Sequence, residues 1–146
     1  MATMDTVPLL INVGVTSMMT GIIWFVQVVH YPLFAVIDPT GFAVYERGHT
    51  RLTGYVVAPL MIIELVAAAW LVLSNTAEAW VALGLAVSLW IITFTVHVPL
   101  HRALSSTHEP RLIRKLVATN WLRTILWTTR SGLLLLMLAG AFSDPA

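Results

Sequence analysis

Apolar residues dominate the chain in four long runs that are separated by short polar stretches. Each run is near the roughly 20 residues that a helix needs to cross a bilayer. The pattern predicts helices over about 8–30, 39–74, 77–104 and 110–142. Short connections make successive helices antiparallel neighbours. We therefore expect an all-α, integral membrane four-helix antiparallel bundle that forms a single transmembrane domain over 1–146.

Aspartate, asparagine and proline mark the places where these helices begin. Asp38 followed by Pro39 fits an N-cap with proline at the first helical position. Pro110 fits the first turn of the fourth helix in the same way. Asn75, with Glu78 three residues further on, resembles a capping box that opens the third helix. Charged residues follow both helix starts at 39 and 110, so the second and fourth helices should begin outside the lipid.

Composition supports a membrane protein and removes several classes of function. Hydrophobic residues make up 58% of the chain and charged residues 10%, against roughly 25% charged residues in an average soluble domain. The chain has no cysteine, which excludes disulfides, thiolate metal sites and thiol nucleophiles. It also lacks a phosphate-binding glycine loop and a nucleophile elbow. We therefore expect no nucleotide partner and, without a basic face, no nucleic acid partner.

The basic residues predict how the bundle sits in its membrane. Six of the eight lysines and arginines lie in the first and third connections or at the adjoining helix ends. The positive-inside rule therefore places these connections in the cytoplasm and both termini on the periplasmic side of a bacterial inner membrane. The second and fourth helices then extend on the cytoplasmic side. Three basic residues form a juxtamembrane run that should attract anionic lipid headgroups at about 1 kcal/mol each: Arg111, Arg114 and Lys115.

Two arginines interrupt the fourth apolar run, and each needs a partner or a cavity. A charge at the bilayer centre costs at least about 2.5–3.5 kcal/mol. Counting about 1.5 Å per residue from the outer helix ends places Glu64 and Arg130 at similar depths of roughly 16–18 Å, near the midplane. A buried Glu64–Arg130 ion pair is the simplest solution. Its role stays open between a structural link from the second helix to the fourth and part of a proton or substrate relay.

The other arginine belongs to a polar layer nearer the cytoplasmic interface. Helical spacing puts Asn120, Arg123 and Trp127 on the same face as Arg130. The depth count places residues of all four helices in one layer about 28 Å from the outside: Gln27, Tyr55, His97 and Arg123. A second layer lies one turn further in, and His49 can fold over it. Together these layers give a candidate ligand- or cofactor-binding cluster of six residues: His30, His49, His97, His101, Asn120 and Arg123.

Imidazoles gathered at one end of a bundle are candidate metal ligands. A mononuclear zinc, iron or copper site from Glu46, His49, His97 and His101 is one hypothesis, and haem held by His30 and His97 is another. A carboxylate di-iron site is not expected, because the chain has a single Glu-x-x-His copy, Glu46 with His49. The alternative without a ligand is that these histidines lie at the headgroup level because one end of the ring is apolar and the other wet.

Four segments combine aromatic residues with histidine or arginine: WFVQVVHYPLF (24–34), FAVYERGHTR (42–51), HVPLHRAL (97–104) and NWLRTILWTTR (120–130). In these segments the chain resembles small bacterial four-helix membrane proteins related to the anthrone-oxygenase-like group. The resemblance spans most of the chain and implies a four-helix membrane fold. For the characterised branch it implies oxidation of polycyclic aromatic anthrones with dioxygen, and it assigns no role to any residue.

Two classes of function follow from these observations. The first is an accessory or structural subunit within a larger membrane complex of respiratory or photosynthetic type, with other transmembrane subunits and membrane lipid as partners. The second is a small membrane oxidoreductase or oxygenase that acts on an apolar aromatic or quinone-like molecule at the His/Arg cluster. Haem, pigment, quinone or a single transition metal are the candidate cofactors. An enzyme should show a cavity at the cluster, whereas a packing subunit should show this space filled by side chains.

Overall fold

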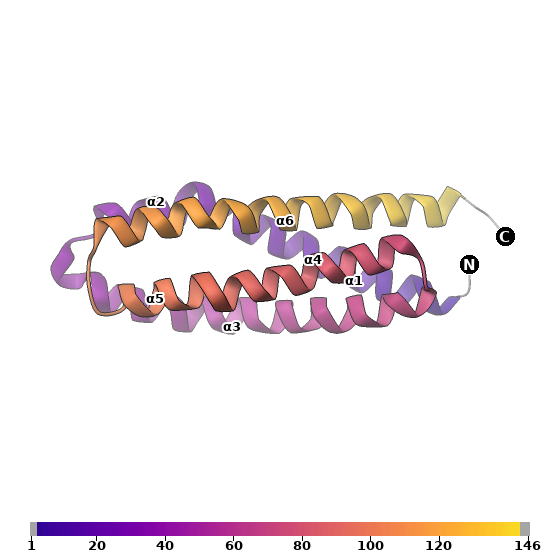
Figure 1. Ribbon diagram of the computed structural model, residues 1–146, viewed down its shortest axis with the longest axis horizontal. Helices are drawn as coiled ribbons and strands as arrows, with labels where there is room; N and C mark the ends of the chain where they lie inside the picture. Colours follow the sequence, from indigo (N-terminus) through magenta and orange to yellow (C-terminus); the bar gives the residue numbers. More distant parts are fainter. Residues whose placement is uncertain (1–2, 144–146) are drawn as a thin grey trace.

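The computed structural model describes residues 3–143, which form a bundle of four long helical segments (Figure 1). Successive segments run in opposite directions, so the predicted all-helical antiparallel four-helix bundle is confirmed. Short π-helical or 3₁₀ turns join some of the helices within a segment. The α-helices are, in chain order, α1 (Thr3–Phe25), α2 (Tyr31–Leu33), α3 (Pro39–Leu71), α4 (Ala77–Ile92), α5 (Val98–Leu104) and α6 (Pro110–Ser143).

Each of the four segments is long and apolar enough to cross a membrane, with lengths of 31, 36, 28 and 34 residues. At about 1.5 Å per residue the second and fourth reach roughly 50 Å, which exceeds the ~30 Å hydrocarbon core of a bilayer. The connections 37–38 and 105–109 lie at one end of the bundle, which we call the basic end because most lysines and arginines are near it. The connection 72–76 lies at the opposite end. Which end faces the cytoplasm stays a prediction.

Two segments contain a wide helical turn just before a proline. The π-helical turn η1 (Val26–His30) joins α1 to α2, and η4 (Thr93–His97) joins α4 to α5. In each, the N–H that follows the turn bonds to the carbonyl five residues back. Pro32 and Pro99 come next, and a proline ring both lacks an N–H and clashes with the carbonyl four residues before it in an α-helix. The wide turn relieves this clash, so the first segment continues past residue 30, where the sequence predicts its end.

Asp38 caps the start of α3, as expected for an aspartate followed by proline. The 3₁₀ turn η2 (Phe34–Val36) leads into this cap. The Asp38 carboxylate accepts hydrogen bonds from the hydroxyl of Thr40 at 2.5 Å and from its N–H at 2.8 Å. Both bonds stabilise the ionised form, so they hold the pKa of the Asp38 carboxyl below its usual range. The cap therefore fixes where α3 begins.

The connection between α3 and α4 differs from the predicted capping box. The 3₁₀ turn η3 (Val72–Ser74) ends at Asn75, whose φ of 54° lies in the left-handed region that asparagine tolerates. Thr76 is the N-cap of α4, and its hydroxyl accepts a hydrogen bond from the Ala79 N–H at 3.3 Å. Asn75 thus ends the preceding turn, because a left-handed residue reverses the chain and does not have the extended conformation of an N-cap.

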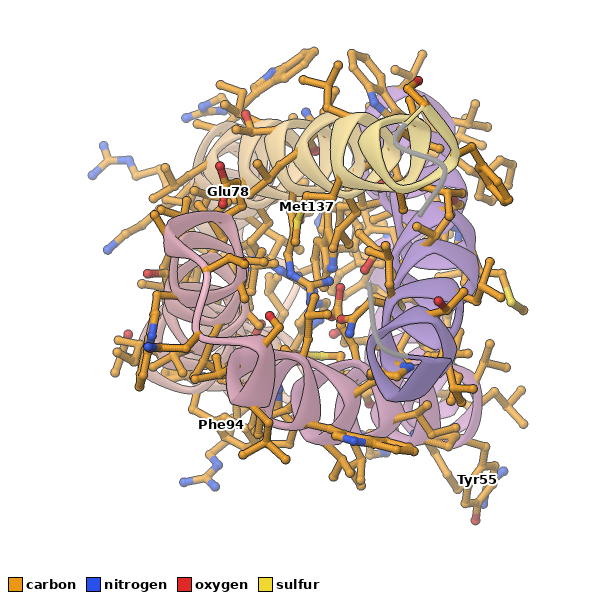
Figure 2. All side chains as sticks on the ribbon, turned by 90° about the vertical axis from the view of Figure 1, so that its right-hand side faces the viewer. Tyr55, Glu78, Phe94 and Met137 are labelled. Atoms are coloured by element: carbon orange, nitrogen blue, oxygen red, sulfur yellow. The ribbon has the colours of Figure 1, made fainter. Side chains whose placement is uncertain are left out.

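The bundle is apolar both inside and outside. One buried cluster near the α3–α4 connection includes Leu9, Leu71 and Leu134, and a larger one extends toward the basic end. The outer faces also carry large apolar side chains, which would contact lipid in a membrane, and Figure 2 shows Phe94 and Tyr55 pointing away from the interior. Tyr55 is 71% exposed, so its predicted place in the inner polar layer is wrong. It lies nine residues before Glu64, which is two and a half helical turns and hence the opposite face of α3.

Candidate functional site

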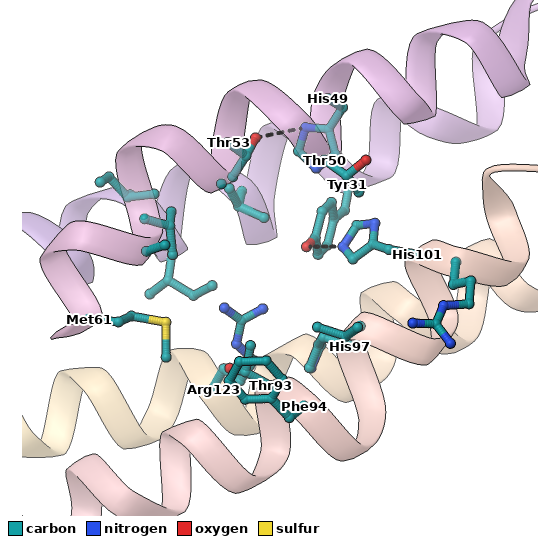
Figure 3. A pocket seen from close by; sticks show the side chains of 18 of the residues that line it. Tyr31, His49, Thr50, Thr53, Met61, Thr93, Phe94, His97, His101 and Arg123 are labelled. Atoms are coloured by element: carbon teal, nitrogen blue, oxygen red, sulfur yellow. Dashed lines mark hydrogen bonds between the residues drawn. The ribbon is translucent and has the colours of Figure 1, made fainter. Parts of the chain in front are cut away.

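A cavity of about 480 Å³ lies between the helices near the basic end (Figure 3). Its wall is formed by α1, α3, α4, η4 and α5, with Val26 from η1, Tyr31 from α2 and Arg123 from α6. Most of the wall is apolar and includes Met19, Val57 and Met61. Sites for small molecules commonly measure about 300–1,000 Å³ and are lined in this way, with few polar groups. The cavity is therefore large enough for a small organic ligand.

The mouth of the cavity faces the side of the bundle. Those wall residues that are exposed belong to α3, η4 and α5, including Ala58, Phe94 and Val98. Phe94 is 57% exposed and Val98 is 38% exposed. Arg47 and Arg102 flank the same opening nearer the basic end. An apolar molecule would therefore enter between α3 and the η4–α5 segment, from the surface that lipid would cover.

The inner wall of the cavity carries five buried polar atoms without a hydrogen-bond partner. They are His97 Nδ1 and Nε2, Arg123 Nε, Trp90 Nε1 and Thr93 Oγ1. The His97 side chain is 1% exposed and that of Arg123 is 6% exposed. Each buried polar group without a partner costs about 1–3 kcal/mol, and native proteins keep few of them. These atoms belong to four residues that line one cavity, so the polar part of its wall is concentrated on this side.

The π turn η4 supplies three residues of this wall, namely Thr93, Phe94 and His97. Turns of this kind frequently occur at functional sites. His97 ends η4 and stands two residues before Pro99, just as His30 ends η1 two residues before Pro32. The same His-x-Pro sequence thus creates both wide turns and places a histidine at the end of each.

Arg123 is held along α6 but has no carboxylate partner among the described side chains, those of residues 6–143. Its Nη1 donates to Asn120 Oδ1 at 3.3 Å, and Asn120 Nδ2 donates to Gln27 Oε1 at 2.9 Å. The guanidinium carbon lies 5.1 Å from the ring centre of Trp127. A cation over an indole face gains about 0.5–2 kcal/mol, which does not replace the hydration that a buried charge loses. Arg123 therefore favours an anion or a strong hydrogen-bond acceptor in the cavity.

Two further histidines of the predicted cluster contact each other on the opposite wall. His30 Nε2 lies 2.8 Å from His49 Nδ1, and that nitrogen is also 3.1 Å from the Thr53 hydroxyl. The ring centres of His49 and His101 are 5.4 Å apart. Of the predicted cluster, His49, His97, His101 and Arg123 line the cavity, whereas His30 and Asn120 lie behind its wall.

His101 joins this wall to a buried carboxylate. Its Nε2 lies 2.8 Å from the Tyr31 hydroxyl, and its Nδ1 lies 2.5 Å from Glu46 Oε1. Glu46 is fully buried, and its second oxygen, Oε2, has no partner. Tyr31, His101 and Glu46 come from α2, α5 and α3, so three segments meet in one chain of hydrogen bonds. We call these three residues the Tyr–His–Glu chain.

Among the side chains of residues 6–143, the predicted mononuclear metal ligands do not come together as one donor set, and haem held by His30 and His97 stays a prediction. No group of three or more His, Cys, Asp or Glu side chains in this range has an arrangement that could hold a metal ion. Both ring nitrogens of His101 already have hydrogen-bond partners, and His30 Nε2 is hydrogen-bonded to His49 Nδ1. His97 contacts none of these groups through its ring nitrogens. His49, His97 and His101 thus line the same cavity without forming one donor set with Glu46.

A second polar centre lies deeper in the bundle, at the position predicted for the intramembrane ion pair. Arg130 Nη1 lies 2.5 Å from Glu64 Oε1, and the two side chains are 0% and 1% exposed. Arg130 also donates from Nη2 to Asn12 Oδ1 at 2.6 Å and from Nε to the Ala82 carbonyl at 3.0 Å. One guanidinium thus contacts the first, second and third segments from the fourth.

The carboxylate of this pair is equally well satisfied. Glu64 Oε1 accepts from the Thr16 hydroxyl at 2.9 Å, and the Trp127 indole N–H lies 3.2 Å from both carboxylate oxygens. Trp127 therefore touches both centres, with its N–H on Glu64 and its face under Arg123. Because neither Glu64 nor Arg130 lines the cavity, the geometry favours a structural link over a relay.

The three basic residues at the start of α6, Arg111, Arg114 and Lys115, are all exposed near the basic end. Their contact with lipid headgroups stays a prediction.

Tyr31 and Thr93 are the site residues that sequence reasoning missed. Tyr31 could have been predicted as a site residue from its position between His30 and Pro32, beside a proline that widens the helix. Thr93 carries no comparable signal, because a lone threonine in an apolar run also occurs wherever its hydroxyl can bond to its own helix.

Fold and site together define a small four-helix membrane protein with a side-opening apolar cavity and a polar inner wall. Comparisons with protein-family models, with curated proteins and with solved structures find no match. The resemblance to the anthrone-oxygenase-like group is therefore supported only as far as the four long apolar helices.

Proposed function

We propose that the protein binds an apolar, quinone-like or aromatic molecule in this cavity, with a carbonyl or other acceptor group directed at Arg123 and His97. The observation that carries the proposal is the combination of a 480 Å³ apolar cavity with a buried arginine that has no carboxylate partner among the side chains of residues 6–143. The apolar wall would bury the body of the molecule. The unpartnered groups would recognise its polar end.

The chemistry of the inner wall narrows the ligand further. Arg123 Nε and Trp90 Nε1 are donors without an acceptor, and His97 can present a donor on either ring nitrogen. These three donor groups, one of which is the Arg123 cation, suit an oxygen with two lone pairs and partial negative charge. Carbonyl and phenolate oxygens have this character, whereas an ammonium or a hydrocarbon would leave every one of these donors unpaired.

This proposal ranks ahead of an accessory or structural subunit. A packing subunit was expected to fill the space at the His/Arg cluster with its own side chains, and the cavity lies at that place. Membership of a respiratory or photosynthetic complex stays a hypothesis, and gentle extraction followed by size determination would test it. An oxidoreductase or oxygenase acting on the bound molecule is the enzymatic form of the present proposal, in line with the anthrone-oxygenase-like resemblance.

The test compares two flat ligands of similar size in lipid nanodiscs. Naphthoquinone has two acceptor oxygens and naphthalene has none, so the site should prefer naphthoquinone. Binding would be measured by equilibrium dialysis of nanodiscs with and without protein. Arg123→Gln should reduce the affinity for naphthoquinone by about tenfold or more, the equivalent of about 1.4 kcal/mol, and leave that for naphthalene unchanged.

Arg114→Gln provides the matched control, because Arg114 is an exposed arginine of the same helix that lies outside the cavity. It should bind both ligands like the parent protein. Equal affinity for the two ligands, or an Arg123→Gln variant that keeps the preference, would show that the inner wall does not recognise an acceptor. The proposal would then be wrong.

A further inference from the structure

The Tyr–His–Glu chain is not needed to hold a ligand at Arg123, yet it ends in the same cavity. Tyr31 and His101 both line the cavity, while Glu46 lies behind His101 and is fully buried. Figure 3 shows the Tyr31 hydroxyl and the Arg123 guanidinium facing the same space from different helices. A hydroxyl backed by an imidazole and a carboxylate is an arrangement that can move a proton.

We propose that the Tyr–His–Glu chain exchanges a proton with the molecule bound at Arg123, so that the cavity enolises an apolar ketone. This inference rests on the proposed function, because it needs a carbonyl oxygen at Arg123. It goes further by naming a reaction, proton abstraction from the carbon next to that carbonyl. Tyr31 accepts the proton from the ligand carbon. His101 takes up the proton that the Tyr31 hydroxyl releases, and Glu46 stabilises the resulting imidazolium.

The direction of the hydrogen bonds defines the step. With Glu46 as the carboxylate, His101 donates from Nδ1 to Oε1, and its Nε2 accepts from the Tyr31 hydroxyl. When Tyr31 Oη takes the proton from the ligand carbon, its own proton passes to His101 Nε2. The C–H electron pair becomes the C=C bond, and the carbonyl electrons move to the oxygen. The products are an enolate and an imidazolium, and no oxidant or reductant takes part.

Both charges formed in this step meet an opposite charge that is already in place. The imidazolium lies beside Glu46, and the enolate oxygen lies beside Arg123, which has no other anion among the side chains of residues 6–143. A ketone offers Arg123 only a dipole, whereas the enolate offers a full charge. The interaction is thus stronger after proton transfer than before it, which is the requirement for catalysis rather than for binding alone.

The neighbouring groups are compatible with this path. His49 packs 5.4 Å from the His101 ring centre and bonds to His30 and Thr53 rather than to the chain. The His101 side chain is 13% exposed, so a proton taken from the ligand can exchange with water. Reversal of the step would then return a solvent-derived proton to the ligand carbon.

The experiment uses 2-tetralone, a bicyclic ketone with acidic C–H groups, and the full chain in nanodiscs in heavy water. Deuterium incorporation, followed by mass spectrometry, should be faster than in protein-free nanodiscs. Tyr31→Phe should slow the protein-dependent rate by about 100-fold or more, and Glu46→Gln should also slow it. The matched control is His108→Gln, because His108 packs on Phe42 outside the cavity and should leave the rate unchanged.

Naphthoquinone binding, measured on the same samples, separates the two proposals. Tyr31→Phe should retain that binding, which also shows that the variant is folded. Parent protein that binds naphthoquinone but does not accelerate deuterium exchange would overturn the enolisation inference and leave the binding proposal standing. Exchange that is equally fast in Tyr31→Phe would overturn the role of the chain. Absence of binding and of exchange together would overturn the binding proposal itself.

Discussion

Arg123 and Arg130 lie seven residues apart on the same face of α6, and of the two only Arg130 contacts a carboxylate of residues 6–143. Arg130 is enclosed by Glu64, Asn12 and the Ala82 carbonyl. Arg123 instead borders the cavity with an unpartnered Nε. Two identical residue types, two turns apart, thus have different consequences. Arg130 links the fourth segment to the other three, whereas Arg123 leaves a positive charge available to a ligand.

Loss of one partner from the Glu64–Arg130 pair should destabilise the protein strongly. Glu64→Gln leaves the Arg130 charge buried without an anion, and such changes typically cost about 3–5 kcal/mol of unfolding free energy. Thermal unfolding in detergent should therefore show a lower Tm. Glu78→Gln, a change of the same type at an exposed position, should leave the Tm within error. A Glu64→Gln variant that inserts and melts like the parent would contradict the structural role of the pair.

Filling the cavity from α3 should block the ligand without harming the fold. Gly54 lines the cavity, and a Cβ at this position would meet no atom within 4 Å. Gly54→Leu should therefore fold normally and bind naphthoquinone more weakly. Gly54→Ala should raise the unfolding free energy by about 0.5–1 kcal/mol, because alanine favours a helix over glycine. Gly132→Leu, at an exposed helical glycine outside the cavity, should bind like the parent; reduced binding there would mean that the leucine effect is not local.

The cap at the start of α3 should respond to acid. The pKa of the Asp38 carboxyl is lower in the folded protein than in the unfolded chain, because the hydroxyl and N–H of Thr40 bond to the ionised form. Its contribution to stability is therefore complete above the unfolded pKa of about 3.9 and is lost as the pH falls through the lower folded value. Asp38→Asn keeps an acceptor without a titrating group.

Unfolding scans from about pH 7 to about pH 3 would detect this contribution. The Tm difference between the parent protein and Asp38→Asn should be constant at the higher pH values and should shift in favour of the variant below about pH 4. Glu78→Gln serves as the control at an exposed carboxylate. Parallel Tm curves for the parent and Asp38→Asn over the whole range would contradict the role of the ionised cap.

The basic end should face the cytoplasm. The chain has no cysteine, so single-cysteine variants can be labelled with a membrane-impermeant maleimide. Ser106→Cys, at the basic end, should be labelled only after lysis, whereas Glu78→Cys, at the opposite end, should be labelled in intact cells. Both positions are exposed, which makes access through the membrane the only difference tested. The opposite labelling pattern would reverse the predicted orientation.

The sequence predicted the helical segments well because long apolar runs ended by polar residues leave few alternatives. Charge was equally informative for Glu64 and Arg130, because depth along a helix follows directly from counting residues. The same count failed for Tyr55, since it measures depth and ignores rotation about the helix axis. The left-handed Asn75 was also missed, because asparagine serves equally in N-caps and in C-caps.

The cavity could not be predicted, because it depends on which side chains leave space unfilled. His30, His49, His97 and His101 were expected in one cluster; His30, His49 and His101 have neighbouring rings, and His97 lines the same cavity without a hydrogen bond to them. The wide turns η1 and η4 also change the rotation of the residues that follow them, which a regular helical period does not contain. The Tyr–His–Glu chain has the same origin, since three segments must meet before its members touch.

Because of the two π turns, the geometry of the site depends on the exact number of residues in each segment. Each turn holds one residue more than an α-helical turn would, and one residue corresponds to about 100° of rotation. Deleting one residue within Thr93–His97 would leave the apolar run, and hence the ability to insert, almost intact. It would nevertheless turn the groups on one side of the deletion by more than a quarter of a circle relative to those on the other. Loss or gain of one codon could thus switch this bundle between a form with a lined cavity and a plain scaffold of the same fold.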